Sequence, residues 1–281
     1  MATYKTVIFE QLFDERWNPR TRKVRDPIVT LRDIQAKIQE FNESAPRAIS
    51  DRNPANFFKD FVRHMDRANK QWPESILERG YTAVQMTGGG KAFEFVPLGP
   101  NQDEPFEKLT PEQGLKFKSI QSLSIQPLAR QLGRREETWL MQVASKLNII
   151  ETHLALRSQV KDQLVHVELL QLGIKQNRAE IDGLYLGHDV AGRGVLIPVE
   201  AKVRDDIYAS QVYAQAEALC GMRGLQNKNI DRIIPMAIKV IGPSKIYVVE
   251  FPSVDFPEET ISPQEPYSTS AYRLVPEVNG I

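Results

Sequence analysis

Cysteine and histidine are scarce in this sequence, and their scarcity excludes several kinds of site. The 281 residues include one cysteine, Cys220, and four histidines with no close ligand spacing. A single thiol cannot form an internal disulfide or a cysteine-cluster zinc site. The histidine spacing makes a histidine metal site equally unexpected. Cysteine usage of this kind fits a protein of the reducing cytoplasm.

Long apolar runs are also absent. No run of apolar residues approaches the ~20 that a bilayer-spanning helix needs, and the first residues are too charged for a signal peptide. Hydrophobic and charged residues make up 41% and 26% of the chain, as in soluble globular proteins. We therefore expect a soluble cytoplasmic protein with no membrane partner.

The basic residues are locally concentrated, although they are not in excess. Lysine plus arginine and aspartate plus glutamate number 36 each, so the formal net charge is zero. A neutral protein can still bind DNA through a locally basic surface, because the local field attracts phosphates. Residues 16–25 hold five basic residues and no acid, which predicts phosphate contacts; a solvated basic segment is the alternative. The candidate DNA-binding residues are Arg20, Arg22, Lys23 and Arg25.

The first part of the chain shows the element order of a DNA-binding module. The expected elements are a β-like run at 6–9, helices at 31–41, 56–69 and 74–78, and a β-hairpin over 81–96. Two helices followed by a hairpin are typical of a winged-helix-like α+β domain. The hairpin tip would then meet phosphate through Gly89, Gly90 and Lys91, whereas an ordinary glycine turn is the alternative.

A proline-rich stretch separates this part from the rest. Four prolines and one glycine punctuate residues 97–111, and such residues interrupt helices and strands. We therefore expect an N-terminal DNA-recognition domain over residues 1–110 and a second domain over residues 111–281.

The second part mixes helices and strands, which predicts an α/β fold with a mixed sheet. The expected helices cover 136–147 and 207–219, and the expected strands cover 149–156, 164–174, 179–186, 195–203, 232–241 and 245–251. A turn at Gly242–Ser244 joins the last two strands. The acidic, proline-rich segment after Pro252 is expected to be an extended strap or a loose end.

Charged residues interrupt the apolar strand expected at 195–203. Alternation along a strand places its apolar residues on one face and Glu200 and Lys202 on the other. The preceding strand likewise carries Glu180 and Asp182 on one face. Charges are costly to bury unless they are paired or bind something. A solvated hairpin with a glutamate–lysine pair is the structural alternative to a functional site.

Two carboxylates and a lysine at one place have a specific chemical use. Asp182 and Glu200 offer hard oxygen ligands to Mg²⁺, which usually shares its shell with water and substrate phosphate. The metal polarises the phosphoryl group and lowers the pKa of a bound water. Lys202 can position that water or stabilise the charge that builds on the phosphate.

Asp182, Glu200 and Lys202 resemble the PD-(D/E)xK nuclease superfamily, in which an aspartate ends one strand and Glu-x-Lys lies on the next. The resemblance covers about residues 136–251, and no other lysine in the chain has an acid two residues before it. Ile181 stands where the signature has proline. The resemblance implies a restriction-endonuclease-like catalytic domain that needs Mg²⁺.

The resemblance also implies supporting residues and partners. Glu180 would assist at the site, and Gln211 would approach the metal from the following helix, with Gln215 on the same helix face. Glu137 or Glu151, both before the aspartate strand, would complete the site. A type II restriction enzyme implies double-stranded DNA as substrate and a homodimer that cuts both strands, and it admits a cognate DNA methyltransferase as partner.

Two other functions fit the same residues. A repair or recombination nuclease would recognise a DNA structure instead of a base sequence. A DNA-binding regulator would use the nuclease-like domain as a scaffold without catalysis. The intact set of Asp182, Glu200 and Lys202 favours an enzyme over a scaffold. Dependence of cleavage on base sequence would separate the restriction enzyme from the structure-directed nuclease.

Overall fold

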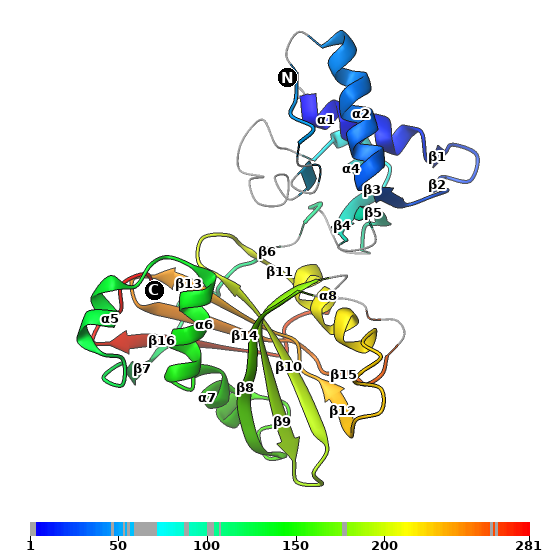
Figure 1. The fold of residues 1–281 in the computed structure, drawn as a ribbon. Coiled ribbons are helices and arrows are strands. Elements are labelled where there is room, and N and C mark those ends of the chain that lie inside the picture. Colours follow the sequence, from blue (N-terminus) through cyan, green and yellow to red (C-terminus); the bar gives the residue numbers. More distant parts are fainter. Residues whose placement is uncertain are drawn as a thin grey trace. The chain divides into compact units, whose positions relative to one another are not determined.

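The computed structural model describes most of the chain, which divides into two compact units. Described are residues 4–45, 48–52, 54, 57–58, 72–86, 90–99, 104–106, 108–175, 179–258, 261 and 264–281. The units are Met1–Glu107 and Lys108–Ile281 (Figure 1). The sequence places the boundary between residues 110 and 111, in the proline-rich stretch.

The N-terminal unit combines helices with a three-stranded antiparallel sheet. Its elements are α1 Tyr4–Asp14, β1 Trp17–Asn18, β2 Lys23–Val24, β3 Ile28–Thr30, α2 Leu31–Ser44, α4 Glu74–Leu77, β4 Tyr81–Gln85 and β5 Lys91–Pro97. In the sheet, β5 lies between β3 and β4, while β1 and β2 form a separate hairpin. The helices expected at 31–41 and 74–78 and the hairpin over 81–96 are confirmed. The helix expected over 56–69 lies, apart from residues 57 and 58, outside the described residues.

Helix α1 contradicts the β-like run expected at residues 6–9. The buried apolar residues on one face of this helix are Ile8, Phe9, Leu12 and Phe13. Phe9 packs against rings far along the chain, with ring centroids 5.3 Å from Trp72 and 5.1 Å from Phe93. The prediction was wrong because a window of four residues is too short to reveal the helical period.

Helix α2 begins with a capping box. The Thr30 hydroxyl accepts a hydrogen bond from the Asp33 N–H at 3.1 Å, and the Asp33 carboxylate accepts one from the Thr30 N–H at 2.8 Å. The same carboxylate lies 3.0 Å from the Arg16 guanidinium. The cap therefore fixes the start of α2 and holds Arg16 against it.

The second unit is built on a nine-stranded mixed sheet. Its strands are β7 Phe117–Gln121, β8 Leu164–Lys175, β9 Glu180–Asp189, β10 Gly194–Lys202, β12 Ile230–Ile233, β13 Met236–Gly242, β14 Lys245–Glu250, β15 Val254–Asp255 and β16 Ser268–Val275. Strand β10 is central: it pairs antiparallel with β9 on one side, and parallel with β12 and then β13 on the other. The order continues through β14 and β16 to β7. Two short strands, β6 Lys108–Leu109 and β11 Ile207–Tyr208, pair with each other.

Helices cover both faces of this sheet (Figure 1). They are α5 Pro127–Leu132, α6 Glu137–Lys146, α7 Ile149–Arg157 and α8 Ala209–Cys220. Alternation along the strands separates two cores: in β13, Met236 and Ile238 face α6 and α7, whereas Ala237 faces α8. The unit is therefore a mixed α/β fold. No helix in the described ranges has the length and apolar character to cross a membrane.

Residues 149–156 form helix α7 and not the expected strand. The buried residues on one helical face are Ile149, Ile150, His153 and Leu154. Apolar and polar residues alternate in part of this segment, which favoured a strand. The spacing of one, three and one residues between the buried positions fits the helical period instead.

One expected strand, residues 232–241, is two strands in the structure. Ile234 and Pro235 separate β12 from β13, because proline has no backbone N–H to donate to a ladder. The Ile234 N–H instead donates to the Leu196 carbonyl at 2.8 Å. The interruption lets one chain segment follow both halves of β10.

The segment after Pro252 contains a core strand, so the expected strap or loose end is wrong where the segment is described. Strand β16 lies between β14 and β7. Its buried residues are Ser270, Ala271, Tyr272 and Leu274. The acidic and proline-rich residues lie mostly before β16. An interpretation based on the composition of the whole segment therefore missed the strand. The expected turn at Gly242–Ser244 does join β13 to β14, with Ser244 at a φ of 53°.

Candidate active site

The charged residues of β9 and β10 meet where these strands separate. Backbone pairing between the strands ends at Gly183 opposite Val199. At the residue before Gly183, the Asp182 carboxylate accepts a hydrogen bond from the Ala201 N–H at 2.8 Å. Beyond Gly183 a side-chain hydrogen bond therefore replaces the backbone hydrogen bonds between the strands, and it fixes Asp182 beside the charged end of β10.

Glu200 and Lys202 form a buried ion pair at that end. The Lys202 ammonium donates to one carboxylate oxygen of Glu200, and it lies 3.8 Å from a carboxylate oxygen of Glu137 in the first turn of α6. Glu200 and Lys202 are only 8% and 7% exposed. The sheet and α6 therefore both hold the lysine, whose buried charge is paired with the carboxylates of two glutamates.

Helix α8 contributes Gln215, which sequence reasoning did not place at the site. Its amide group donates to the second carboxylate oxygen of Glu200 and to the Glu180 carbonyl, the latter at 3.0 Å. Gln215 is 1% exposed. One buried side chain therefore ties α8 to both strands and fixes the direction of the Glu200 carboxylate.

The structure leaves Gln211, the glutamine assigned to the site from the sequence, without this contact. The Gln211 side-chain oxygen is buried and has no hydrogen-bond partner among the described residues. Gln211 and Gln215 lie four residues apart, so the helical pattern puts both on one face. The pattern could not tell which of them reaches Glu200. The start of α8 at Ala209, after the short strand β11, sets that register.

The other expected acids lie differently. The Glu180 side chain is exposed and lies 3.8 Å from Lys175, so Glu180 reaches the site through its backbone carbonyl. Glu151 is half-buried in the first turn of α7, where burial raises its pKa. No hydrogen bond or ion pair described in the structure joins Glu151 to Lys202. Of the two helix acids, Glu137 is the one that approaches the lysine.

The electrostatics of the cluster are unbalanced at Asp182. Burial and, next, the neighbouring Glu200 carboxylate raise the pKa of Asp182 from 3.8 to about 7, although the Ala201 N–H and Lys202 oppose the shift. Burial by itself would lower the pKa of Lys202, but the carboxylates of Glu200 and Glu137 outweigh burial and raise it above 10.5. Lys202 is therefore a stable cation, while Asp182 titrates near neutral pH, as groups at functional sites often do.

The donor set at this point fits a hard cation that is completed by substrate. Among the described residues, no three histidine, cysteine, aspartate or glutamate side chains form a group that could hold a metal. Asp182 and Glu200 supply two carboxylates, and Gln215 adds a buried amide oxygen with no hydrogen-bond partner among the described residues. Mg²⁺ is commonly held by one or two carboxylates, with water and substrate phosphate completing its shell. A cation would also offset the repulsion that raises the pKa of Asp182.

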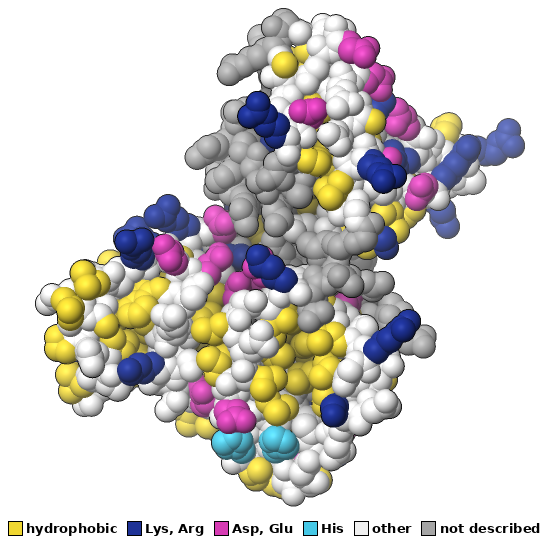
Figure 2. Space-filling model, viewed as in Figure 1, with side chains coloured by type: hydrophobic (Ala, Val, Ile, Leu, Met, Phe, Trp, Pro, Cys, Tyr) yellow, Lys and Arg dark blue, Asp and Glu magenta, His cyan; other side chains and the backbone are white. Residues whose placement is uncertain are grey.

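The basic residues assigned to DNA lie on the β1–β2 hairpin. Arg20, Arg22, Lys23 and Arg25 are all exposed, and Arg22 has a φ of 52° at the tight tip. The Arg25 N–H closes the hairpin by donating to the Arg16 carbonyl at 2.9 Å. Figure 2 shows the dark blue basic side chains gathered at this tip.

The tip of the β4–β5 hairpin is only partly described. Gly90 has a φ of 75°, and its carbonyl accepts a hydrogen bond from the Leu31 N–H at 2.7 Å. Lys91 opens β5, whereas Gly89 lies outside the described residues. The described side of this tip is therefore tied to the start of α2.

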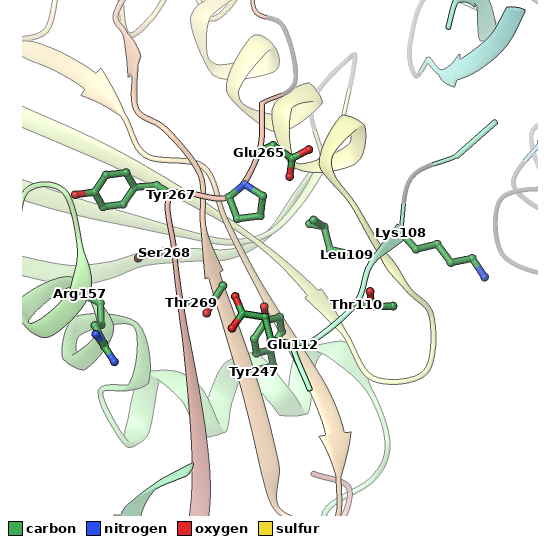
Figure 3. A pocket seen from close by; sticks show the side chains of 11 residues that line it. Lys108, Leu109, Thr110, Glu112, Arg157, Tyr247, Glu265, Tyr267, Ser268 and Thr269 are labelled. Atoms are coloured by element: carbon green, nitrogen blue, oxygen red, sulfur yellow. The ribbon is translucent and has the colours of Figure 1, made fainter. Parts of the chain in front are cut away.

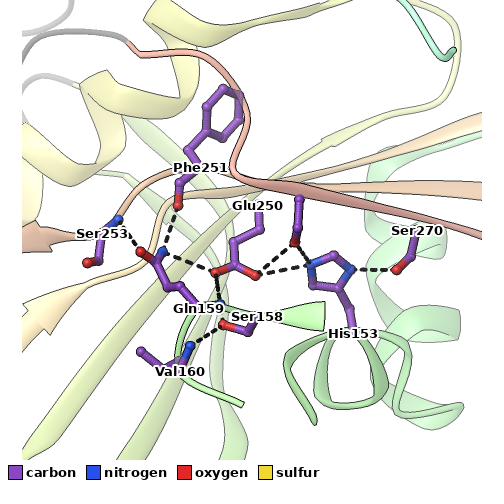
Figure 4. Close-up of polar contacts among 9 residues, drawn as sticks. His153, Ser158, Gln159, Val160, Glu250, Phe251, Ser253 and Ser270 are labelled. Carbon is purple, nitrogen blue, oxygen red and sulfur yellow. Dashed lines mark hydrogen bonds and ion pairs between the residues drawn. The ribbon is translucent and has the colours of Figure 1, made fainter. Parts of the chain in front are cut away.

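A second buried charged cluster joins α7 to β14 and β16 (Figure 4). Glu250 accepts hydrogen bonds from the Ser158 hydroxyl at 2.8 Å and from the backbone and side-chain N–H groups of Gln159 at 3.2 and 3.1 Å. Its other oxygen lies 3.2 Å from Nε2 of His153, whose Nδ1 lies 2.9 Å from the Ser270 hydroxyl. His153 and Glu250 are both 0% exposed. The cluster is closed to solvent, and the sequence missed it because residues 149–156 were expected as a strand.

Comparisons of the chain with known protein families, curated proteins and solved structures give no match. The functional assignment therefore depends on the chemistry of the residues that the fold brings together.

Proposed function

We propose that this protein is a Mg²⁺-dependent endonuclease that cuts double-stranded DNA at specific sequences, like type II restriction enzymes. The observation that carries the proposal is the convergence of Asp182, Glu200 and Lys202 from two strands at one buried point. The raised pKa of Asp182 supports a functional role, because a purely structural carboxylate gains nothing from an adjacent like charge.

The residues of the cluster have separate tasks in phosphodiester hydrolysis. Asp182 and Glu200 would hold Mg²⁺, and the bound metal would supply Lewis-acid activation of the phosphate and of a water. Lys202, held between Glu200 and Glu137, would stabilise the negative charge that grows on the phosphate. Gln215 would keep the Glu200 carboxylate in one orientation.

The N-terminal unit supports a sequence-reading role. Its sheet order, β3–β5–β4, and the helices between β3 and β4 suit the winged-helix-like arrangement expected from the sequence. The exposed basic hairpin β1–β2 would contact phosphates and so position this unit on the duplex. A homodimer would bring two active sites to the two strands.

Incubation of plasmid and phage DNA with purified protein and Mg²⁺ tests this proposal. The informative variants are Lys202→Ala and Asp182→Asn, in which asparagine can still accept the hydrogen bond from the Ala201 N–H. The matched controls are Lys161→Ala and Asp162→Asn, which make the same changes at exposed positions.

Discrete fragments from wild type and both controls, lost in both site variants, are the expected result. A smear lost in the same two variants would place the site in a nuclease that ignores base sequence. Tight DNA binding without cleavage by wild type would contradict catalysis and favour the regulator.

A further inference from the structure

A groove opens at the edge of the large sheet, away from the residues used above. One cavity of about 740 Å³ lies against β14 and β16, and an adjoining hollow of about 280 Å³ shares part of its lining. Strand β7 starts to pair with β16 only at Ala271, so the edge of β16 is open before that residue. We call the two hollows together the edge groove. Its main lining residues are Lys108, Glu112, Lys116, Arg157, Tyr247 and Thr269.

Four parts of the fold supply this lining (Figure 3). Lys108 and Glu112 come from the segment that enters the unit, and Tyr247 comes from β14. Arg157 comes from the last residue of α7, and Thr269 from β16. The groove therefore lies wholly within the second unit and is shaped by elements of the catalytic fold itself.

Strand register connects the groove to the candidate active site. Lys202 lies opposite Lys239, and Lys239 lies opposite Tyr247 in the next strand. Paired residues on neighbouring strands point to the same face of a sheet. Tyr247 is therefore on the Lys202 face, two strand spacings or roughly 10 Å away. That distance corresponds to about three nucleotides at 3.4 Å of rise per nucleotide.

Charge continues along this row. The Asp206 carboxylate lies 2.6 Å from the Lys239 ammonium and 3.3 Å from that of Lys108, which lines the groove. Further along the groove, Lys116, Lys118 and Arg157 are exposed, and none of them has an ion-pair partner in the described part of the chain. Lys118 lies opposite Tyr272 and so on the other face from Tyr247, which means that these three cations flank the open edge of the sheet, beyond the row that starts at Lys202.

The mixed lining indicates a nucleotide chain in preference to an isolated anion. Glu112 and Glu265 are also exposed in the groove, and they would repel a small anion. A nucleotide strand presents phosphates to cations and exocyclic base amines to carboxylates, which accept such hydrogen bonds. The half-exposed side chain of Tyr267, 52% accessible, adds a hydroxyl that can donate a hydrogen bond to a backbone phosphate.

We infer that the edge groove binds the strand of DNA that flanks the phosphodiester held at Asp182, Glu200 and Lys202. The inference rests on the proposed function and extends it by naming the substrate segment that the second unit holds. Phosphates about three or more nucleotides from the reacting one would contact Lys116, Lys118 and Arg157.

Binding of a fluorescently labelled DNA duplex, measured by anisotropy at several salt concentrations with Ca²⁺ in place of Mg²⁺, tests the inference. The groove variant is Lys116→Ala/Lys118→Ala/Arg157→Ala. The control is Lys161→Ala/Arg223→Ala/Lys228→Ala, which removes two lysines and one arginine at exposed positions elsewhere in the same unit. Thermal unfolding of both variants establishes that they are folded.

The expected result is a loss of affinity of about tenfold or more in the groove variant, with the slope of log K against log salt reduced by about 0.9 for each lost phosphate contact. The control should keep the affinity and slope of wild type. Equal affinity and equal salt dependence in the two triple variants would overturn the inference that the groove binds DNA, while leaving the proposed nuclease activity intact. Failure of wild type to bind DNA at all would instead overturn the proposed function and the groove with it.

Discussion

The second unit buries two carboxylate clusters in one sheet, and the two differ in how completely their charges are satisfied. Glu250 is 0% exposed, and donors from Ser158, Gln159 and Ser268 surround it beside His153. Glu200, 8% exposed, is also hydrogen-bonded, but its neighbour is a second carboxylate, Asp182. The first cluster is complete without any ligand, whereas the second contains a repulsion that a cation would relieve.

This difference separates a structural role from a functional one. A fully satisfied buried network rigidifies a core, and its members lock the packing of the elements they join. A partly satisfied buried network lowers stability unless a ligand completes it, and buried groups with perturbed pKa values are for this reason candidates for a functional site. Burial and charge alone do not distinguish the clusters; the count of satisfied partners does.

The largest expected effect is on cleavage. Lys202→Ala should reduce the cleavage rate by about 10²–10³-fold, because it removes one preorganised cation from the developing charge on phosphate. Single-turnover kinetics with prebound DNA measure this step. If Glu250→Gln reduced the cleavage rate per folded molecule by the same factor, the two clusters could no longer be distinguished as functional and structural.

A loss of stability should mark the other cluster. Glu250→Gln places an amide N–H₂ among groups that already donate, so it should lower the free energy of unfolding by about 3 kcal/mol. Urea denaturation followed by circular dichroism measures the change. A shift in midpoint no larger than that of the exposed Glu168→Gln control would mean that the network contributes little.

The pH dependence should come from Asp182. Because its pKa is raised from 3.8 to about 7 in the folded state, the folded protein binds this proton more tightly than the unfolded chain. Without a divalent cation, the stabilising contribution is therefore complete below pH 3.8 and is lost as pH rises through 7, by at most about 4 kcal/mol.

Cleavage should show the opposite trend, because the ionised carboxylate is needed to hold the cation. The rate should fall about tenfold for each pH unit below 7 at limiting Mg²⁺. Rates measured across this range at fixed ionic strength check the prediction. A cleavage rate that does not change between about pH 5 and pH 8, a range that spans the raised pKa of Asp182, would show that cleavage does not require the ionised form of Asp182.

The smallest effect should separate the two glutamines of α8. Gln215→Ala removes the donor to Glu200 and should reduce activity by about tenfold. Gln211→Ala removes no described hydrogen bond and should have a much smaller effect. Cleavage rates at saturating Mg²⁺, measured side by side, give the comparison. A reversal of the order would restore the assignment of Gln211 made from the sequence.

The sequence predicted the fold best where strand alternation was strong. The alternation around Val199 and Ala201 placed β10 and its two faces correctly, because each residue of this strand shows by its polarity which face of the sheet it belongs to. Short segments failed at α1 and α7, where four to eight residues fit both periods. Strand β16 was missed because its place between β14 and β7 depends on pairing with residues far along the chain.

The candidate site shows the same limit. Asp182, Glu200 and Lys202 could be found from residue types on adjacent strands, and the structure brings them together. Gln215 could not be separated from Gln211, because the rotation of α8 depends on the preceding strand β11 and its distant partner β6. Sequence patterns identify the chemistry, while tertiary pairing decides which side chain completes it.

The most direct test is urea denaturation of wild type, Asp182→Asn and Glu250→Gln above pH 7, with and without Mg²⁺. A ligand that binds only the folded state stabilises it, so Mg²⁺ should stabilise wild type and Glu250→Gln but not Asp182→Asn. Without Mg²⁺, Asp182→Asn should be at least as stable as wild type, because it removes the carboxylate repulsion. A strongly destabilised Asp182→Asn, together with no effect of Mg²⁺ on wild type, would show that both clusters are structural and would contradict the account.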